Sequence, residues 1–250
     1  MRLQKLIALT TELSRRTAEQ AIAKGLVTVN GTVVTVMGTT VDPLKDKVYF
    51  KGRPLRTPER FYYLAFYKPR RVLVTKNDPE GRPTIWEYLE SWKGKLNSAG
   101  RLDFESEGLI LLTNDGEMLN ALTHPRHEIF KIYEAKVRGV PAKETLDNLK
   151  NGVRLDDGKT LPAEVRVLSV KESNAWIEIS IREGRYRQIR RMCEAVGHDV
   201  LKLKRVSVGP IRLARMKPGE WRFLSQKEVS SLREALATKQ SHGIAKLSSR

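Results

Sequence analysis

The chain contains very little cysteine and histidine. Among its 250 residues there is one cysteine, Cys193, so an internal disulfide and a cysteine-rich zinc site are both excluded. No two of the four histidines stand at the spacing of metal ligands. We therefore expect no metal centre in this protein.

Long apolar runs are also missing. No segment approaches the roughly 18 consecutive apolar residues that indicate a membrane-spanning helix. The N-terminal stretch, residues 1–16, has only a four-residue apolar patch, which is too short for the core of a signal peptide. We expect a cytoplasmic protein with no membrane partner.

Negative charge is scarce relative to positive charge. There are 46 Lys and Arg residues against 29 Asp and Glu, which gives a formal net charge of +17 at pH 7. Such a surplus favours a polyanionic partner, because neutralising phosphates releases counterions and makes binding salt-dependent. An anionic membrane is the alternative, but we find no basic amphipathic helix with a broad apolar face. The composition predicts a folded protein that binds RNA or DNA.

A small basic domain is predicted for residues 1–58. Ser14 is placed to cap a helix that Gly25 would end, and the helix has an apolar stripe on one side. Two β-rich runs then flank Asn30-Gly31, the strongest short signal for a hairpin. We predict a helix–helix–hairpin domain followed by a polar linker over residues 51–60. Three basic side chains of the helix are left to face solvent: Arg15, Arg16 and Lys24.

Longer strands with helices between them are predicted for residues 59–236. Strand patterns cover residues 61–67, 109–113, 131–140, 175–184 and 199–209, and helical patterns cover residues 114–125, 142–152 and 185–198. The fold class is therefore α+β, in two domains. Residues 237–250 carry three positive charges and little to bury, so we expect a flexible basic tail there.

One acidic stretch stands out in this basic chain. Asp103, Glu105 and Glu107 follow Arg101 at alternating positions and lead into an apolar strand. They fit the first positions of a calcium loop, but positions 9 and 12 are Leu111 and Asn114, which do not supply the required ligands. Two explanations remain: a solvated turn, or a single catalytic acid with bystanders.

Residues 182–205 form a basic segment with eight Lys or Arg and three acids. The predicted helix places Arg187 and Arg190 on one face, with Arg191 beside it. Because few acids are near in sequence, these arginines need either an external anion or a carboxylate from elsewhere in the chain; a solvated face is the alternative. Tyr133 lies on a predicted strand, where it is either a core residue or a platform on which a base stacks.

Five segments resemble bacterial ribosomal RNA pseudouridine synthases of the RsuA/RluB family, and they occur along the chain in the same order as in that family. They are "GRLDFESEGLILLTNDGE", "YLAFYKPRRVLVTKNDPEGRPT", "LTHPRHEIFKIYEAKVRG", "EGRYRQIRRMCEAVGHDVLKLKRVSVGPIRL" and, at the N-terminus, "LSRRTAEQAIAKGLVTVNG". The last of these is similar to the αL RNA-binding motif first described in a small-subunit ribosomal protein. The likeness covers residues 2–236 and departs at Arg71, where the family usually has Gly.

The resemblance implies a role for particular residues. It makes Asp103 the catalytic aspartate, Tyr133 the ring that stacks on the target uracil, and Leu203 an apolar wall. Arg190 would form an ion pair with Asp103, with Arg187 as the other possible partner. Arg101 and Arg187 would contact the substrate, and further RNA contacts are expected from Arg15, Arg16, Lys24, Arg185 and Arg191.

The resemblance also implies the reaction and the fold. We expect isomerisation of uridine to pseudouridine in ribosomal RNA, with no cofactor, by a monomer whose catalytic domain is a mostly antiparallel or mixed sheet with flanking helices. Overall likeness favours large-subunit over small-subunit RNA. The alternatives are a non-catalytic RNA-binding or ribosome-assembly factor, the same chemistry on transfer RNA, and a metal-dependent nucleic-acid hydrolase.

Overall fold

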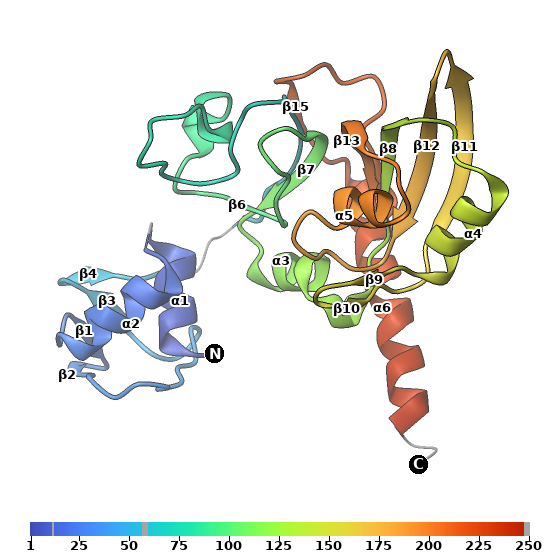
Figure 1. The fold of residues 1–250 in the computed structure, drawn as a ribbon. Helices are drawn as coiled ribbons and strands as arrows, with labels where there is room; N and C mark the ends of the chain where they lie inside the picture. Colours follow the sequence, from blue (N-terminus) through green and yellow to red (C-terminus); the bar gives the residue numbers. More distant parts are fainter. Residues whose placement is uncertain (12, 57–59, 248–250) are drawn as a thin grey trace.

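The protein is described by a computed structural model that covers residues 1–11, 13–56 and 60–247. A small N-terminal domain precedes a larger domain built around one curved sheet (Figure 1). Each domain has its own hydrophobic core, and the larger domain has a core on each side of its sheet.

The N-terminal domain confirms the predicted helix–helix–hairpin order. Helix α1 spans Leu3–Thr10 and α2 spans Arg15–Ala23; the Ser14 hydroxyl accepts a hydrogen bond from the Thr17 N–H at 3.0 Å, as expected for an N-cap. Asn30 and Gly31 have φ angles of +52° and +86°, the left-handed pair that a tight hairpin needs. A four-stranded sheet contains β2 (Thr32–Val33), β1 (Val27–Val29), β3 (Val48–Phe50) and β4 (Arg53–Pro54), in that order.

The predicted linker begins too early. Lys51 and Gly52 form a turn, and residues 53–54 pair with β3. The proline in β4 is compatible with this pairing because β4 is an edge strand, where no N–H is required. Of the remaining predicted linker, residues 57–59 lie outside the described part of the chain.

The larger domain is built on a mixed, mostly antiparallel sheet, as predicted. Its main strand order is β11-β12-β8-β13-β7-β5-β15, with β14 paired to β13 and β6 paired to β7. Only β13 and β7 run parallel. The strands are β5 (Tyr63–Lys68), β6 (Asn97–Ser98), β7 (Glu107–Thr113), β8 (Lys131–Arg138), β11 (Glu164–Lys171), β12 (Asn174–Ile181), β13 (Val200–Val208), β14 (Ile211–Arg212) and β15 (Trp221–Phe223); β9 (Arg154–Leu155) and β10 (Gly158–Lys159) form a separate hairpin.

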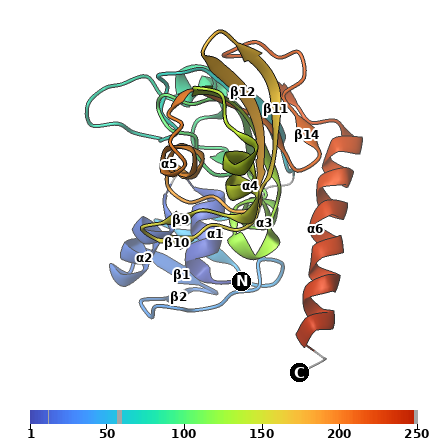
Figure 2. The same cartoon turned by 45° about the vertical axis from the view of Figure 1, so that its right-hand side comes forward.

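Helices cover both faces of this sheet. Leu149 of α4 (Lys143–Asn151) and Ile189 of α5 (Gln188–Ala195) pack into one core, while Met118 of α3 (Gly116–Thr123) and Leu232 of α6 (Gln226–Leu247) pack into the other. Figure 2 shows α6 along one side of the domain, with its C-terminal part extending past the sheet. Short 3₁₀ turns cover Ile85–Glu87, Glu90–Trp92 and Pro125–His127.

One predicted boundary is wrong. The helix expected over residues 185–198 is limited to α5, because Arg187 has a left-handed backbone with φ of +47° and precedes the first turn. Residues 237–247 continue α6, and the flexibility expected for residues 237–250 stays a prediction. Among the described residues no helix is long and apolar enough to cross a membrane.

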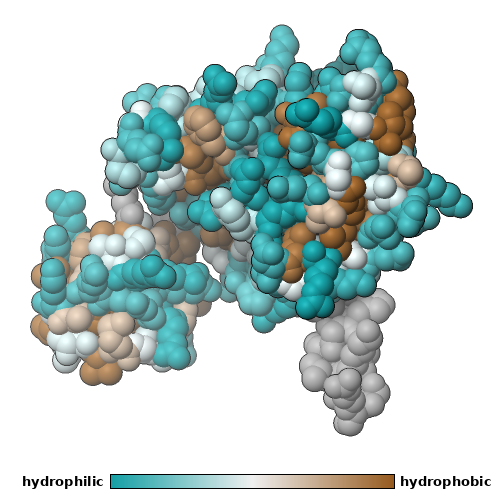
Figure 3. All heavy atoms as spheres, in the orientation of Figure 1, coloured by the Kyte–Doolittle hydropathy of each residue, from teal (hydrophilic) through white to brown (hydrophobic). Residues whose placement is uncertain are grey.

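Strand β11 forms the edge of the sheet opposite to β15, and part of this edge is apolar. Strand β11 exposes Val167, Leu168 and Val170, and apolar side chains are visible at this edge in Figure 3. Charged residues Glu164, Arg166 and Lys171 lie along the same strand, a pattern that opposes edge-to-edge association.

Candidate active site

Asp103 lies in the loop that joins β6 to β7. Gly100 has a φ of +83°, which lets the chain turn tightly before the loop, and the Ser106 N–H donates to the Asp103 carbonyl at 3.1 Å. The Asp103 side chain is half-buried. No hydrogen bond or ion pair joins its carboxylate to any residue that the structure describes. This acid is therefore held in place by its loop and remains open to a ligand.

Most of the predicted site residues meet in one cleft. Tyr133 on β8 and Leu203 on β13 line it and are 8% and 5% exposed, respectively. The two strands are antiparallel neighbours, which brings residues 70 positions apart in sequence to the same wall. Arg101 and Arg187 line the cleft with Asp103 and are exposed. The predicted Arg185 also lines the cleft. Sequence reasoning missed the six other lining residues: Leu102, Ser106, Ile181, Gly184, Gln188 and Ile189.

The expected ion pair between Asp103 and Arg190 is not present. Arg190 Nη1 donates to the Val200 carbonyl at 3.0 Å, and its Nη2 lies 3.5 Å from the Glu105 carbonyl. Burial, followed by repulsion from Arg187, lowers the pKa of Arg190, while attraction to Asp103 opposes that shift. Helix α5 therefore brings Arg190 close enough to Asp103 for electrostatic attraction, but its guanidinium binds backbone carbonyls.

Arg185 and Arg191 are already paired with acids; for Arg191 the partner is a carboxylate from elsewhere in the chain, one of the two alternatives that the sequence left open. Arg191 makes a bidentate contact with Asp157, at 2.7 and 3.1 Å. Arg185 donates to Glu183 and to the carbonyls of Asp157, Gly158 and Lys159. The Arg191 guanidinium, helped by Arg185, lowers the pKa of Asp157 to about 2. These two arginines hold the β9–β10 hairpin against α5, which leaves few donors for RNA phosphates.

The three acids of the stretch have different environments. Glu105 forms ion pairs with Arg70 at 2.5 Å and Arg71 at 3.6 Å, and Glu107 accepts a hydrogen bond from the Tyr67 hydroxyl at 3.2 Å. Asp103 alone lines the cleft. In the described ranges, no group of three or more potential ligands is placed to hold a metal ion. The acids therefore do not converge as a cation loop would require.

Lys68 is a further functional candidate that sequence reasoning missed. It is fully buried at the end of β5, where Nζ donates to the Ser106 carbonyl at 2.7 Å and to the Pro69 carbonyl at 2.8 Å. Burial lowers its pKa to about 8, although attraction to Asp103 works in the opposite direction. The lysine therefore ties the β6–β7 loop to the sheet and adds a buried amine close enough to Asp103 for electrostatic attraction. A charged residue ending an apolar strand is the signal that could have identified it.

The cleft combines few chemical functions. It offers one free carboxylate, an aromatic ring, an aliphatic wall and exposed arginines at its rim. A flat base fits against apolar and aromatic surfaces, and arginines bind phosphates. The carboxylate supplies a nucleophile or a base next to them.

The exposed cations of the N-terminal domain are as predicted. Arg15, Arg16 and Lys24 are exposed along and just after α2, and none forms an ion pair with a described residue. Their contact with RNA remains a prediction.

Comparisons with known proteins agree with this geometry. The RNA pseudouridylate synthase family matches residues 62–195, and the S4 domain matches residues 1–47. "Ribosomal large subunit pseudouridine synthase B" of Bacillus subtilis is 44% identical over 93% of this chain and 95% of that protein. An "Uncharacterized RNA pseudouridine synthase" of Aquifex aeolicus is 39% identical over 96% of each chain.

A solved structure supports the same assignment. "Crystal structure of pseudouridylate synthase" superimposes with a TM-score of 0.68 and 32% identity, covering 93% of this chain and 99% of that chain. The family match includes Asp103 and Tyr133, and the high-identity relatives extend over both domains. The chain belongs to the RNA pseudouridylate synthase family.

Proposed function

We propose that the chain converts uridine to pseudouridine in ribosomal RNA of the large subunit, with Asp103 as the catalytic carboxylate. The observation that carries this proposal is the position of Asp103: it is the one acid that lines a cleft with Tyr133 and Leu203, and it has no partner among the described residues. Relatives from Bacillus subtilis and Pseudomonas aeruginosa are named large-subunit pseudouridine synthases, which supports the choice of RNA.

The reaction needs a carboxylate and a platform for the base. The N1–C1′ bond of uridine breaks, the uracil turns, a C5–C1′ bond forms, and the proton on C5 moves to N1. No atom is gained or lost and no electron is transferred, so the overall balance calls for no cofactor. The target nucleotide must leave its stack, which costs a few kcal/mol and is offset by stacking and backbone contacts in the cleft.

Asp103 has two routes open to it. Its carboxylate can attack C1′ and form an ester while the base leaves, in the manner of a glycosidase nucleophile. Alternatively it can remove the C2′ proton as the N1–C1′ bond breaks, and return that proton to C2′ when the C5–C1′ bond forms. Both routes require an ionised carboxylate. The Arg190 Nε is buried without a hydrogen-bond partner among the described residues.

Tyr133→Leu should reduce kcat/KM by roughly 10- to 100-fold, because it removes a ring on which the uracil stacks. Tyr133→Phe keeps the ring and should stay within a few-fold of the wild type, since the structure shows no hydrogen bond from the Tyr133 hydroxyl to a described residue. Release of tritium from 5-tritiated uridine in RNA measures both variants. Equal losses for the two would contradict a stacking role.

Removing residues 1–60 should weaken RNA binding and flatten its dependence on salt. Eleven Lys and Arg residues against five acids give this segment a surplus of about six positive charges, and each phosphate contact that is lost removes about one counterion from the salt slope. Filter binding between low and physiological salt measures the slope. An unchanged slope would show that the N-terminal domain does not dock on phosphates.

The RNA itself is identified by comparison of strains. A strain lacking this gene should lose one or a small number of pseudouridines from large-subunit ribosomal RNA, and expression of the intact chain should restore them. Carbodiimide treatment followed by reverse transcription maps the sites. We also propose that the chain acts in the cytoplasm and that it is a monomer. Sedimentation of the purified chain measures its oligomeric state. Loss of a pseudouridine from transfer RNA alone would move the proposal to that substrate.

A further inference from the structure

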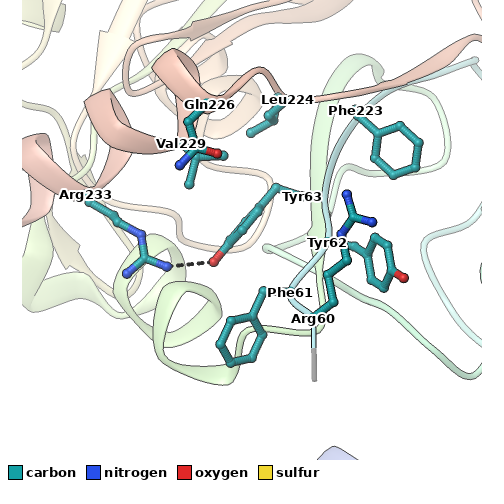
Figure 4. Close-up of a pocket in the computed structure, with 9 residues that line it drawn as sticks. All are labelled: Arg60, Phe61, Tyr62, Tyr63, Phe223, Leu224, Gln226, Val229 and Arg233. Carbon is teal, nitrogen blue, oxygen red and sulfur yellow. Dashed lines mark hydrogen bonds between the residues drawn. The ribbon is translucent and has the colours of Figure 1, made fainter. Parts of the chain in front are cut away.

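An aromatic pocket lies at the start of β5, away from the cleft that holds Asp103. Arg60, Phe61 and Tyr62 line one side of it and Phe223 lines another (Figure 4). Its volume is about 410 Å³, within the roughly 300–1,000 Å³ of small-ligand pockets. No step of pseudouridine formation described above uses it.

Several rings gather here and remain open to solvent. Tyr62 and Phe223 both contact Trp92, with ring centroids 5.1 and 5.6 Å apart, and Trp221 lies 5.6 Å from Phe223. Phe61, Phe223 and Trp221 nevertheless keep 46%, 50% and 37% of their surfaces exposed. Phe223 and Trp221 are in contact, and Phe61 lines the same pocket as Phe223. A cluster of exposed aromatic residues, unlike a single exposed apolar residue, marks a binding site.

The charge at the pocket favours an anionic ligand. The Arg60 guanidinium lies 5.5 Å from the centre of the Tyr62 ring and forms no ion pair with a described residue. On the opposite wall, Arg233 donates to the Tyr63 hydroxyl at 2.8 Å (Figure 4). That hydroxyl in turn donates to Asp115 at 2.7 Å. This wall is therefore internally satisfied and rigid, while Arg60 leaves a positive charge beside the exposed rings.

Strand β5 connects the pocket to the catalytic loop. Tyr63 begins the strand at the pocket, and Lys68 ends it beneath Ser106. Six residues of strand span about 17 Å, a distance that a short length of single-stranded RNA can cross. Tyr62 and Trp92 also pack against the same hydrophobic core that contains Tyr133 and Leu203.

We propose that this pocket binds an unpaired nucleotide of the RNA substrate, with its base stacked on Phe61 and Phe223 and its phosphate at Arg60. Rings accept any base, and an arginine beside them binds the backbone, so the contact adds affinity without reading sequence. The inference rests on RNA being the substrate, but it does not depend on the role of Asp103.

Binding to a labelled oligouridylate of about ten nucleotides tests the proposal with the full chain. Phe61→Leu combined with Phe223→Leu keeps apolar bulk but removes both rings, and it should weaken binding by roughly 5- to 150-fold. The matched control, Phe61→Tyr combined with Phe223→Tyr, keeps the rings and should bind within about two-fold of the wild type. Arg60→Gln should reduce the salt slope by about one. Unchanged affinity in the leucine pair would overturn the proposal.

Photocrosslinking gives a second readout that does not depend on variants. An oligouridylate carrying 5-iodouridine should crosslink to Phe61, Phe223 or Trp221 in the wild-type chain. Crosslinks confined to the cleft around Tyr133 or to the N-terminal domain would overturn the proposal. A separate light-scattering measurement compares the wild type with the leucine pair. If the wild type is a dimer and the leucine pair is a monomer, the rings form a dimer interface and the proposal is overturned. With ribosomal RNA as substrate, the leucine pair should raise KM while kcat stays within a few-fold of the wild type, whereas failure of the catalytic assignment would appear as undiminished kcat in Asp103→Asn.

Discussion

Asp103→Asn should abolish pseudouridine formation while leaving the fold and RNA binding intact. Asparagine has nearly the same shape, but it carries no charge and can neither attack C1′ nor accept a proton. Because the Asp103 carboxylate makes no hydrogen bond or ion pair with a described residue, its loss leaves no other group unpaired. We expect kcat to fall by at least roughly 10⁴-fold, the scale for loss of a reacting group.

The neighbouring acid Glu107 provides a matched control. It belongs to the same stretch, but its carboxylate accepts a hydrogen bond from Tyr67, a role that the amide oxygen of Glu107→Gln can also fill. This variant should retain activity within a few-fold. The measurement is carbodiimide treatment and reverse transcription of RNA incubated with each protein. A normal pseudouridine stop with Asp103→Asn would show that another group performs the chemistry.

Gly108→Ala should have the largest effect on stability. Gly108 has a φ of +115°, and a Cβ there would lie 2.3 Å from the carbonyl oxygen and 2.6 Å from the nitrogen of Arg205. Both contacts are to backbone, which cannot move aside without separating β7 from β13 at their parallel pairing. The hydrogen bond from Arg205 Nε to the Leu109 carbonyl, 2.7 Å, lies at the same crossing. We expect a loss of about 3–5 kcal/mol in the free energy of unfolding.

Urea unfolding measures this loss, and Gly116→Ala is its control. Gly116 is in the first turn of α3, has no positive φ, and a Cβ there would contact only the flexible Lys5 side chain at 3.9 Å. Alanine at this position should be neutral or stabilising by up to about 1 kcal/mol, because it favours the helix. If Gly108→Ala and the wild type unfold at the same urea concentration, then β7 and β13 do not approach each other as closely at Gly108 as the structure indicates.

Local sequence patterns predicted those features that depend on neighbouring residues. The Ser14 cap depends on a residue three positions away, and the Asn30-Gly31 hairpin depends on two consecutive φ angles. The strand pattern over residues 175–184 predicted β12, where Ile177, Ile179 and Ile181 lie in the core. These choices are made by backbone sterics and by side-chain direction, which a short window of sequence contains.

The arginines show where such windows fail. Asp157 pairs with Arg191 from 34 residues away, and Glu105 pairs with Arg70 from 35 residues away. Both pairings arise because strands and hairpins distant in sequence are brought together by the sheet. Counting nearby acids could therefore not decide between an external anion and a distant carboxylate as the partner of Arg191, and it suggested bystander status for Glu105, which pairs with Arg70 in the loop after β5.

The sequence by itself determined the α+β class, the hairpin and cap of the N-terminal domain, and, through its motif, Asp103 as the candidate acid. Tertiary structure alone decided which groups surround that acid. Parallel pairing of β7 with β13 places Gly108 against Arg205, and β8 beside β13 brings Tyr133 and Leu203 to one wall. The end of β5 places Lys68 under the loop. The reason is physical: strand order and register bring together residues from distant parts of the chain, and no local period encodes that order.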